Sequence, residues 1–230
     1  MLLQPGFGGA SVTFPHKLSI GPLLDSVSEA ARKLGAVNTV VAQDTPSGRE
    51  LRGENTDWLG ILKCIQGSST LKPHDRTGLV IGAGGAARAA VFAYQNLGVR
   101  RIAIVNRTRS TAEKLVADFP SLNIEIYGSL AEAPPANIIV GCIPADDVKE
   151  DDIPGHIFAE EGGLVVEMSY RPPVSALMRV ASRRHSGWTV RDGLDVLREQ
   201  AYAQFEMWIA RRAPVLAIEE ALAKASAGKT

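Results

Sequence analysis

The chain has 230 residues, of which 45% are hydrophobic and 22% are charged. This composition excludes a disordered or fibrous protein and provides enough apolar side chains for a buried core. Acidic and basic residues are equally numerous, at 25 each, so net charge gives no general attraction to nucleic acid or to an anionic membrane surface. Since a domain typically has ~150 residues, the length predicts two unequal lobes.

Cysteine content and hydropathy narrow the class further. Two cysteines, Cys64 and Cys142, are too few for a disulfide framework and lack the spacing of a metal site. No apolar run reaches the roughly 18 residues that a membrane-spanning helix needs, and the first residues do not have the pattern of a signal peptide. We therefore expect a soluble, cytoplasmic protein that binds no metal, membrane or nucleic acid.

Residues 1–70 have the pattern of a small α/β lobe. We expect a strand at 10–14, a helix at about 23–34, a strand at 39–42 and a helix at about 56–65. Residues 67–70 have the composition of a linker. The polar segments 11–17, 35–39 and 53–58 carry the side chains of this lobe that are suited to chemistry.

From residue 71 to 192 the pattern alternates between strand and helix. Strands are expected at 79–81, 102–105, 124–127, 138–140 and 164–168. Ser110 and Glu113 fit a capping box that begins one of the helices, and Gly98 fits the end of another. The alternation predicts a Rossmann-type, doubly wound parallel sheet. Residues 193–230 return to helix, with apolar side chains at helical spacing, and are expected to pack back onto the first lobe.

A glycine-rich turn follows the first strand of the parallel sheet. It consists of Gly82, Ala83, Gly84, Gly85 and Ala86. Glycines let the backbone approach a pyrophosphate, and the helix that follows directs free N–H groups and its positive dipole end at that anion. A turn of this kind also occurs as a simple tight turn, so its context decides the interpretation.

The end of the next strand indicates which dinucleotide binds. Asn106, Arg107 and Thr108 stand close to the roughly 20-residue spacing at which this fold contacts the ribose. Users of NAD place an acidic residue there, whereas arginine, followed here by Arg109, suits a 2′-phosphate. The sequence therefore predicts NADP. The alternative is that these arginines only solvate the end of a strand.

Five motifs together resemble those of the shikimate dehydrogenase family. Three belong to the substrate lobe and occur in the family's order, at 8–17, 35–39 and 55–57; the other two are the glycine turn and residues 106–108. Segments 54–60, 142–146 and 203–208 are most similar to the fungal type. There the domain ends a pentafunctional shikimate-pathway polypeptide, and a relative ends the quinate-pathway repressor.

The resemblance implies an NADP-dependent shikimate dehydrogenase of aromatic amino acid biosynthesis, which transfers hydride between NADPH and 3-dehydroshikimate. It implies that Lys17 and Asp57 are the catalytic pair, in which the ammonium group donates to the forming alkoxide and the carboxylate orients it. Outside such motifs, a lysine and an aspartate more often form a surface ion pair. The resemblance also assigns substrate contacts to Thr13, Asn38, Tyr170 and Gln200, and the neighbourhood of the nicotinamide to Met168 and Gly193.

The sequence also departs from the family pattern. It begins almost at the lysine motif, so the paired serines that hold the substrate carboxylate in the family are absent, and Ser11 replaces the usual asparagine. We therefore expect an N-terminally truncated substrate lobe, weakened substrate binding and an open sheet edge, which a homodimer or other shikimate-pathway domains would cover. Two alternatives stay open: a catalytically silent regulatory module that binds pathway metabolites, and a quinate dehydrogenase.

Overall fold

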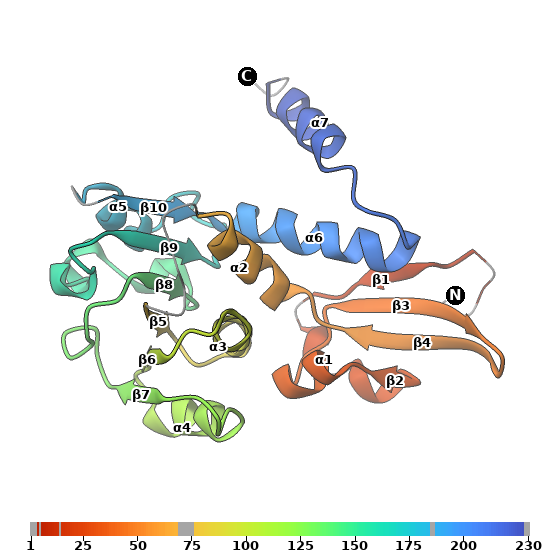
Figure 1. Cartoon of the computed structure of the whole chain (residues 1–230), viewed down its shortest axis with the longest axis horizontal. Coiled ribbons are helices and arrows are strands. Elements are labelled where there is room, and N and C mark those ends of the chain that lie inside the picture. Colours follow the sequence, from red (N-terminus) through yellow and green to blue (C-terminus); the bar gives the residue numbers. More distant parts are fainter. Residues whose placement is uncertain (1–3, 5, 14, 69–75, 185–186, 228–230) are drawn as a thin grey trace.

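The computed structural model describes residues 4, 6–13, 15–68, 76–184 and 187–227. Two β-sheets, of four and six strands, lie side by side and are bridged by α2 (Asp57–Gln66) and α6 (Gly193–Ile209) (Figure 1). Phe14, at the end of the first expected strand, and Ser69 and Thr70, at the end of the expected linker, lie outside the described residues.

The larger sheet is parallel throughout, in the order β10-β9-β8-β5-β6-β7. Its strands are β5 (Thr77–Ile81), β6 (Arg101–Val105), β7 (Ile124–Tyr127), β8 (Ile138–Gly141), β9 (Gly163–Glu167) and β10 (Trp188–Arg191). The order reverses between β5 and β8, at the switch point where doubly wound sheets bind ligands. The predicted Rossmann-type fold is confirmed, although no strand is predicted for β10.

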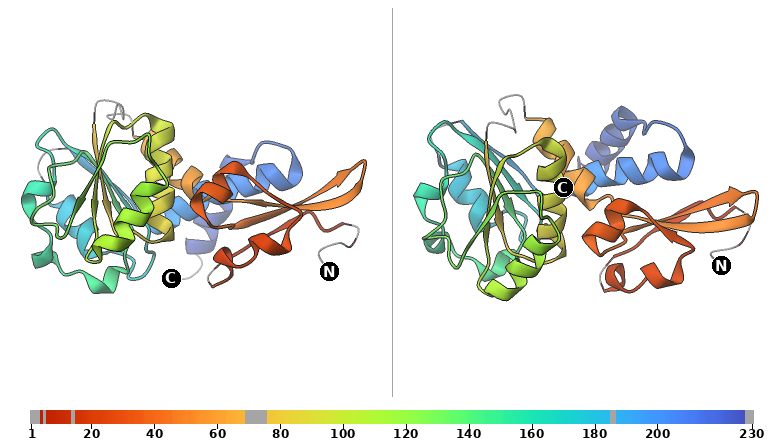
Figure 2. Two further views of the ribbon diagram at one scale, coloured as in Figure 1. Left: turned by 90° about the horizontal axis from the view of Figure 1, so that it is seen from below. Right: turned by 60° about the horizontal axis from the view of Figure 1, so that its bottom comes forward.

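Alternate side chains of these strands enter two apolar layers. Val80 and Ile104 pack in one layer, and Leu79 and Val105 in the other. The covering helices are α3 (Gly85–Leu97), α4 (Arg109–Ala117) and α5 (Ala176–Ser182), and Figure 2 shows helices on both faces of the sheet. The four central strands, β5, β6, β8 and β9, are buried on both faces and therefore appear in the sequence as apolar runs.

The predicted capping box of α4 is wrong. The helix begins at Arg109 with Thr108 as its N-cap, so Glu113 lies too far into the helix to reach back to the cap. Its carboxylate instead accepts a hydrogen bond from Arg109 Nε at 2.9 Å. The predicted end of α3 is confirmed, since Gly98 adopts the left-handed conformation with φ 72°.

The smaller sheet has the order β1-β3-β4-β2. Its strands are β1 (Gly9–Ser11), β2 (Ser26–Val27), β3 (Thr39–Thr45) and β4 (Gly48–Glu54). β3 is longer than the predicted strand at 39–42, and β4, its antiparallel partner, is not predicted. Only Leu51 and Gly53 of β4 are buried, and four of its seven residues are charged, so the strand lacks the apolar run that marks the central strands of the larger sheet.

The first helix is shorter than the predicted one at 23–34. α1 spans Glu29–Leu34, and its N-cap Ser28 accepts a hydrogen bond from Ala31 N at 3.2 Å. The residues before α1 do not belong to this helix. Gly21–Leu23 form a short 3₁₀ helix with Pro22 in its first turn, and Val27 pairs with Gly53 of β4. A further 3₁₀ turn spans His16–Leu18.

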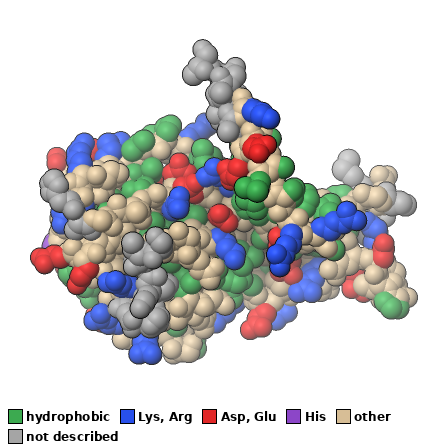
Figure 3. All heavy atoms as spheres, turned by 45° about the horizontal axis from the view of Figure 1, so that its top comes forward, with side chains coloured by type: hydrophobic (Ala, Val, Ile, Leu, Met, Phe, Trp, Pro, Cys, Tyr) green, Lys and Arg blue, Asp and Glu red, His purple; other side chains and the backbone are tan. Residues whose placement is uncertain are grey.

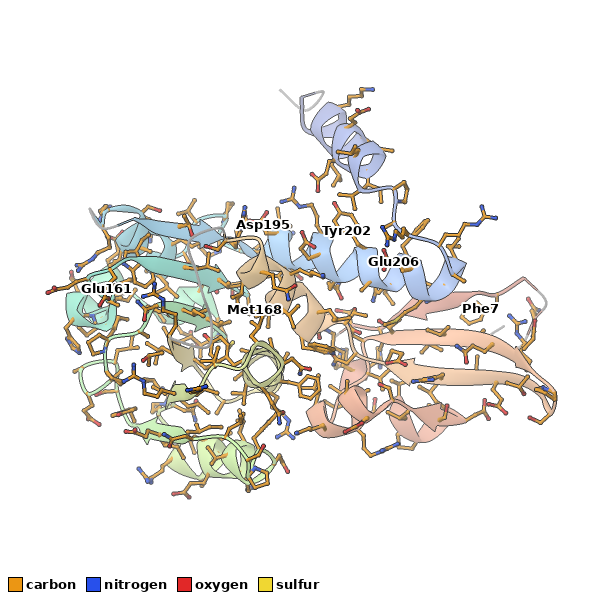
Figure 4. All side chains as sticks on the ribbon, in the orientation of Figure 1. Phe7, Glu161, Met168, Asp195, Tyr202 and Glu206 are labelled. Carbon is orange, nitrogen blue, oxygen red and sulfur yellow. The ribbon has the colours of Figure 1, made fainter. Side chains whose placement is uncertain are left out.

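Helix α6 runs from the larger lobe onto the smaller sheet. Gly60 of α2 permits its close approach, since a Cβ there would lie 2.6 Å from the Val196 carbonyl oxygen, and Trp208 Nε1 donates to Val40 O of β3 at 2.9 Å. α7 (Val215–Ala227) projects beyond α6 (Figure 4). Its Glu219 contacts Tyr202 of α6. Hydrophobic side chains gather at the base of this projection (Figure 3). Among the described residues, none of the helices combines the length and the apolar character that crossing a membrane requires.

Candidate active site

The carboxyl ends of the parallel strands bring the predicted cofactor residues to one edge of the sheet. Gly82 N donates to Val105 O at 2.8 Å, which joins the glycine turn after β5 to the end of β6. Asn106 N donates to Tyr127 O at 3.1 Å, so the next segment continues the same edge. On the other side of β5, Met168 follows β9 at this edge and lies between the two sheets (Figure 4).

The glycine turn has the geometry that a close-lying anion needs. Gly82 has φ 115°, and a Cβ there would lie 2.8 Å from Ile143 Cγ2, so the position requires glycine. Gly84 is the N-cap of α3, and the space around Gly84 and Gly85 is open. Ala83 is buried and Ala86 half-buried. The open backbone and the first N–H groups of α3 therefore fit a pyrophosphate.

Residues 106–109 present two cations beside this turn. Asn106 Nδ2 donates to Thr108 O at 2.8 Å, which shapes the loop into α4. Arg107 is exposed. The Arg109 side chain is 69% exposed, although its Nε contacts Glu113. Both guanidinium groups are therefore accessible to an anionic ligand.

A cavity of about 360 Å³ lies between the lobes. It collects all eight of the predicted catalytic, substrate and nicotinamide residues: Thr13, Lys17, Asn38, Asp57, Met168, Tyr170, Gly193 and Gln200. They come from both lobes and from α6, so the cavity exists only because the lobes are packed together.

Lys17 and Asp57 form an ion pair in this cavity. Lys17 Nζ lies 2.8 Å from Asp57 Oδ2, and the side chains are 32% and 20% exposed. Lys17 stands in the 3₁₀ turn at His16–Leu18, and Asp57 is the first residue of α2, where a carboxylate is favoured by the helix dipole. The neighbouring His16 is exposed and outside the cavity lining.

Asn38 is the hub that connects this pair to α6. Its side chain is almost fully buried, with 2% of the residue exposed. Asn38 Nδ2 donates to Asp57 Oδ1 at 2.9 Å and to Gln200 Oε1 at 2.7 Å, while Asn38 Oδ1 accepts from Thr56 N at 2.7 Å. Asn38 therefore holds the oxygen of Asp57 that Lys17 does not contact.

Two further polar residues of the cavity are not among the predicted ones. Gln204 is buried, donates to Thr39 Oγ1 at 2.9 Å and accepts from Ser11 Oγ at 2.9 Å. The sequence signal for Gln204 is its position four residues after Gln200, on the same face of a helix. Ser11 belongs to the lysine motif, but its partner lies 193 residues away in the chain.

A buried carboxyl group lies next to Met168. Glu167 is 3% exposed, and its carboxylate accepts a hydrogen bond from Ser169 N at 3.0 Å. Burial raises the pKa of Glu167 above the ordinary value of 4.5, because the hydrogen bonds it accepts only partly offset the loss of hydration. Among the described residues, no group of three or more His, Cys, Asp or Glu side chains could hold a metal ion.

Comparison with known proteins gives consistent matches. The family profile described as the shikimate dehydrogenase substrate binding domain matches residues 1–40, and that described as shikimate / quinate 5-dehydrogenase matches residues 67–146. The quinate repressor protein of Emericella nidulans is 40% identical over 92% of this chain and 28% of its own length. The pentafunctional AROM polypeptide of Malassezia globosa is 41% identical over 93% of this chain and 14% of its own. The chain thus spans less than a third of these relatives.

Solved structures agree. The dehydroquinate dehydratase and shikimate dehydrogenase portion of S. pombe AroM superposes with a TM-score of 0.83 at 36% identity, covering 95% of this chain and 43% of that one. A shikimate 5-dehydrogenase from Thermus thermophilus, solved in complex with NADP(H) and shikimate, gives a TM-score of 0.76 at 32% identity, covering 96% of this chain and 80% of that one.

Proposed function

Because the chain belongs to the shikimate dehydrogenase family, we propose that it transfers a hydride between NADPH and 3-dehydroshikimate. The observation that carries this proposal is the ion pair of Lys17 and Asp57, which faces the same cavity as Met168 and Gly193. Met168 lies at the carboxyl edge that also bears the glycine turn. This geometry supports a proton-transfer pair beside a dinucleotide site.

The chemistry that NADPH supplies when bound is a hydride for the carbonyl carbon of the substrate. The ammonium group of Lys17 donates a proton to the carbonyl oxygen as negative charge develops there, and the product is the hydroxyl of shikimate. Asp57 orients Lys17 and balances its charge, while Asn38 holds the second oxygen of Asp57. In the reverse direction, neutral Lys17 accepts the proton of that hydroxyl.

We propose NADP rather than NAD as the cofactor. Arg107 and Arg109 stand where the ribose of a dinucleotide is contacted in this fold. An exposed ion pair such as that of Arg109 with Glu113 contributes at most about 1 kcal/mol, so a 2′-phosphate readily displaces the glutamate. The NADP(H) bound by the Thermus thermophilus relative supports the same cofactor here.

The substrate ring is bound, in this proposal, by the polar side chains that line the cavity. Gln200 Oε1 accepts from Asn38 and from Thr56 Oγ1, whereas its Nε2 has no acceptor among the described residues and is available to a ligand hydroxyl. Tyr170 and Thr13 are exposed at the cavity. Shikimate, which the Thermus thermophilus relative binds, supplies a carboxylate and three hydroxyl groups for such donors.

A second candidate is a regulatory module that binds the same metabolites without turning them over. The similarity to a quinate repressor along most of this chain supports it. Quinate is the alternative substrate, as the description of the matching profile names both shikimate and quinate. A cytoplasmic location stays a prediction, and so does assembly as a homodimer or with other shikimate-pathway domains. The AROM relatives support assembly with such domains.

A direct assay separates these candidates. The chain is incubated with NADP and either shikimate or quinate, and NADPH formation is followed by absorbance. Binding of NADP and of shikimate is measured separately by calorimetry. We expect NADPH formation with shikimate. Formation only with quinate would identify the alternative substrate. NADP and shikimate binding without NADPH formation would establish the regulatory module instead.

A further inference from the structure

Arg88 belongs to the cofactor lobe but directs its side chain to the other lobe. It lies in the first turn of α3, where its backbone N–H donates to Gly84 O at 3.1 Å. Its guanidinium group donates from Nε to Leu34 O and from Nη2 to Lys33 O, both at 2.9 Å. The arginine next to the glycine turn is therefore bonded to the end of α1.

These two bonds complete the C-terminus of α1. The last four carbonyl groups of a helix have no partner inside the helix. Here the N–H groups of Gly35 and Ala36 satisfy the carbonyls of Ala31 and Arg32. The carbonyls of Lys33 and Leu34 accept from Arg88 instead, and a cation at a helix C-terminus is also favoured by the helix dipole.

Neighbouring contacts hold Arg88 in this orientation. Asp118 Oδ2 lies 2.7 Å from Arg88 Nη2, and the Arg88 side chain is only 22% exposed. Lys33 contacts the larger lobe as well: its Nζ donates to Gln95 Oε1 at 3.0 Å and lies 5.0 Å from the centre of the Phe119 ring. The end of α1 is thus fastened to α3 and to the end of α4.

The chain leaving α1 leads directly into the candidate active site. Val37 N donates to Lys17 O at 2.8 Å, and the next residue is Asn38, whose side chain holds Asp57. Only three residues separate Leu34, which accepts from Arg88, from Asn38. A displacement of the end of α1 would therefore move both partners of the ion pair.

We propose that Arg88 is a positioning residue, which couples occupancy of the glycine turn to the placement of Lys17 and Asp57. The proposal rests on the proposed function for the identity of the ligands. A dinucleotide that orders the first turn of α3 orders Arg88 with it, and Arg88 fixes the end of α1. Arg88 itself touches neither ligand; it acts through α1 and Asn38.

Hydrogen exchange tests the contact and the coupling without an activity assay. Backbone exchange over residues 29–38 is compared with and without NADP in the wild-type chain, Arg88→Ala, Arg88→Lys and the control Arg32→Ala. Arg32 is a matched control because its guanidinium donates to Val27 O within its own lobe. We expect NADP to slow exchange over 29–38 in the wild type and in Arg32→Ala. In Arg88→Ala this protection is lost, and in Arg88→Lys, which keeps one cation, it is partly retained.

Kinetics provide a second readout. Couplings between sites typically amount to about 5- to 150-fold, so Arg88→Ala should raise KM for shikimate about 10-fold while changing NADP affinity much less. Asp118→Asn should show a smaller rise, which keeps the test available if Arg88→Ala fails to fold. A parallel fall in NADP affinity and rise in KM for shikimate, without a change in hydrogen exchange over 29–38, would show that Arg88 serves the cofactor site alone. That result would overturn the proposal.

The outcomes also separate this proposal from the proposed function. If NADP binds and shikimate is oxidised, but protection of 29–38 is equal in Arg88→Ala and the wild type, the coupling is wrong and the function stands. If NADP does not bind, the proposed function is wrong. The hydrogen exchange measured without NADP then tests the contact of Arg88 with the end of α1. Faster exchange over 29–38 in Arg88→Ala than in Arg32→Ala then supports the interlobe contact, and equal rates overturn it.

Discussion

Gln200 and Gln204 lie one turn apart on the same face of α6, yet their side-chain amides are used differently. Both ends of the Gln204 amide are bonded within the protein, to Ser11, Thr39 and the carbonyl of Asn38. Gln200 Nε2 has no acceptor among the described residues, whereas its Oε1 is held by Asn38. One glutamine therefore joins α6 to the smaller sheet, and the other offers a donor to the cavity.

This difference predicts opposite effects of two matched substitutions. Gln204→Ala removes buried hydrogen bonds and leaves their partners unsatisfied, so it should lower the free energy of unfolding by about 1 to 3 kcal/mol. Gln200→Ala should change stability less and raise KM for shikimate about 10-fold. Urea unfolding and steady-state kinetics on both variants check this. The same loss of stability in both would show that Gln200 is structural as well.

Removal of either partner of the proposed catalytic pair should depress turnover. Lys17→Ala and Asp57→Asn are each expected to lower kcat by about 10²-fold or more, the scale of general acid–base catalysis, with NADP affinity near normal. The double variant should be little worse, because the two residues act as a unit. The control is Lys63→Ala, an exposed lysine on α2. Full activity of Lys17→Ala would remove Lys17 from the mechanism.

The two arginines after β6 should decide between NADP and NAD. In the proposed cofactor site, Arg107→Ala and Arg109→Ala each remove a charge-assisted hydrogen bond to the 2′-phosphate, worth about 1.5 to 3 kcal/mol. NADP affinity should fall about 10- to 100-fold and NAD affinity should change little. Calorimetric titration with both cofactors measures the two affinities. Arg101→Ala, at the opposite end of the same strand, is the control. An unchanged preference for NADP would contradict this assignment.

A side chain at Gly82 should destabilise the cofactor lobe. Gly82→Ala combines a left-handed backbone with a clash against Ile143, and we expect a loss of about 3 kcal/mol in the free energy of unfolding. Gly98 also has positive φ, but the space around it is open, so Gly98→Ala should lose only about 1 kcal/mol. Chemical denaturation compares the two. Equal losses would mean that contact with Ile143 plays no part.

The buried Glu167 should make stability depend on pH. Its folded pKa is raised by burial, so above pH 4.5 the unfolded chain loses this proton before the folded chain does. The contribution of Glu167 to stability therefore falls as pH rises from 4.5 through the folded pKa. Glu167→Gln, which does not titrate, should gain stability relative to the wild type over this interval. Thermal unfolding at a series of pH values measures the difference, and a difference that is constant with pH would contradict the shift.

Local patterns of the sequence were sufficient for the larger sheet. β5, β6 and β8 are apolar on both faces, and such strands stand out as short apolar runs in any context. The glycine turn and the end of α3 at Gly98 also depend on local backbone geometry. β4 escaped prediction because charged residues stand at four of its seven positions and interrupt any apolar run. The predicted helix at 23–34 was too long because Val27 pairs with β4, which competes with helix formation.

The sequence by itself determined the fold class, the glycine turn, and, through its motifs, eight of the residues that line the cavity. Only the tertiary structure decided how they act together. Asn38 meets Gln200 and Ser11 meets Gln204 because α6 crosses from one lobe to the other, and Arg88 meets Leu34 because α3 packs beside α1. Contacts across 193 or 54 residues of chain depend on the packing of whole elements. No local pattern of side chains records that packing, because it minimises the exposed surface of both lobes at once.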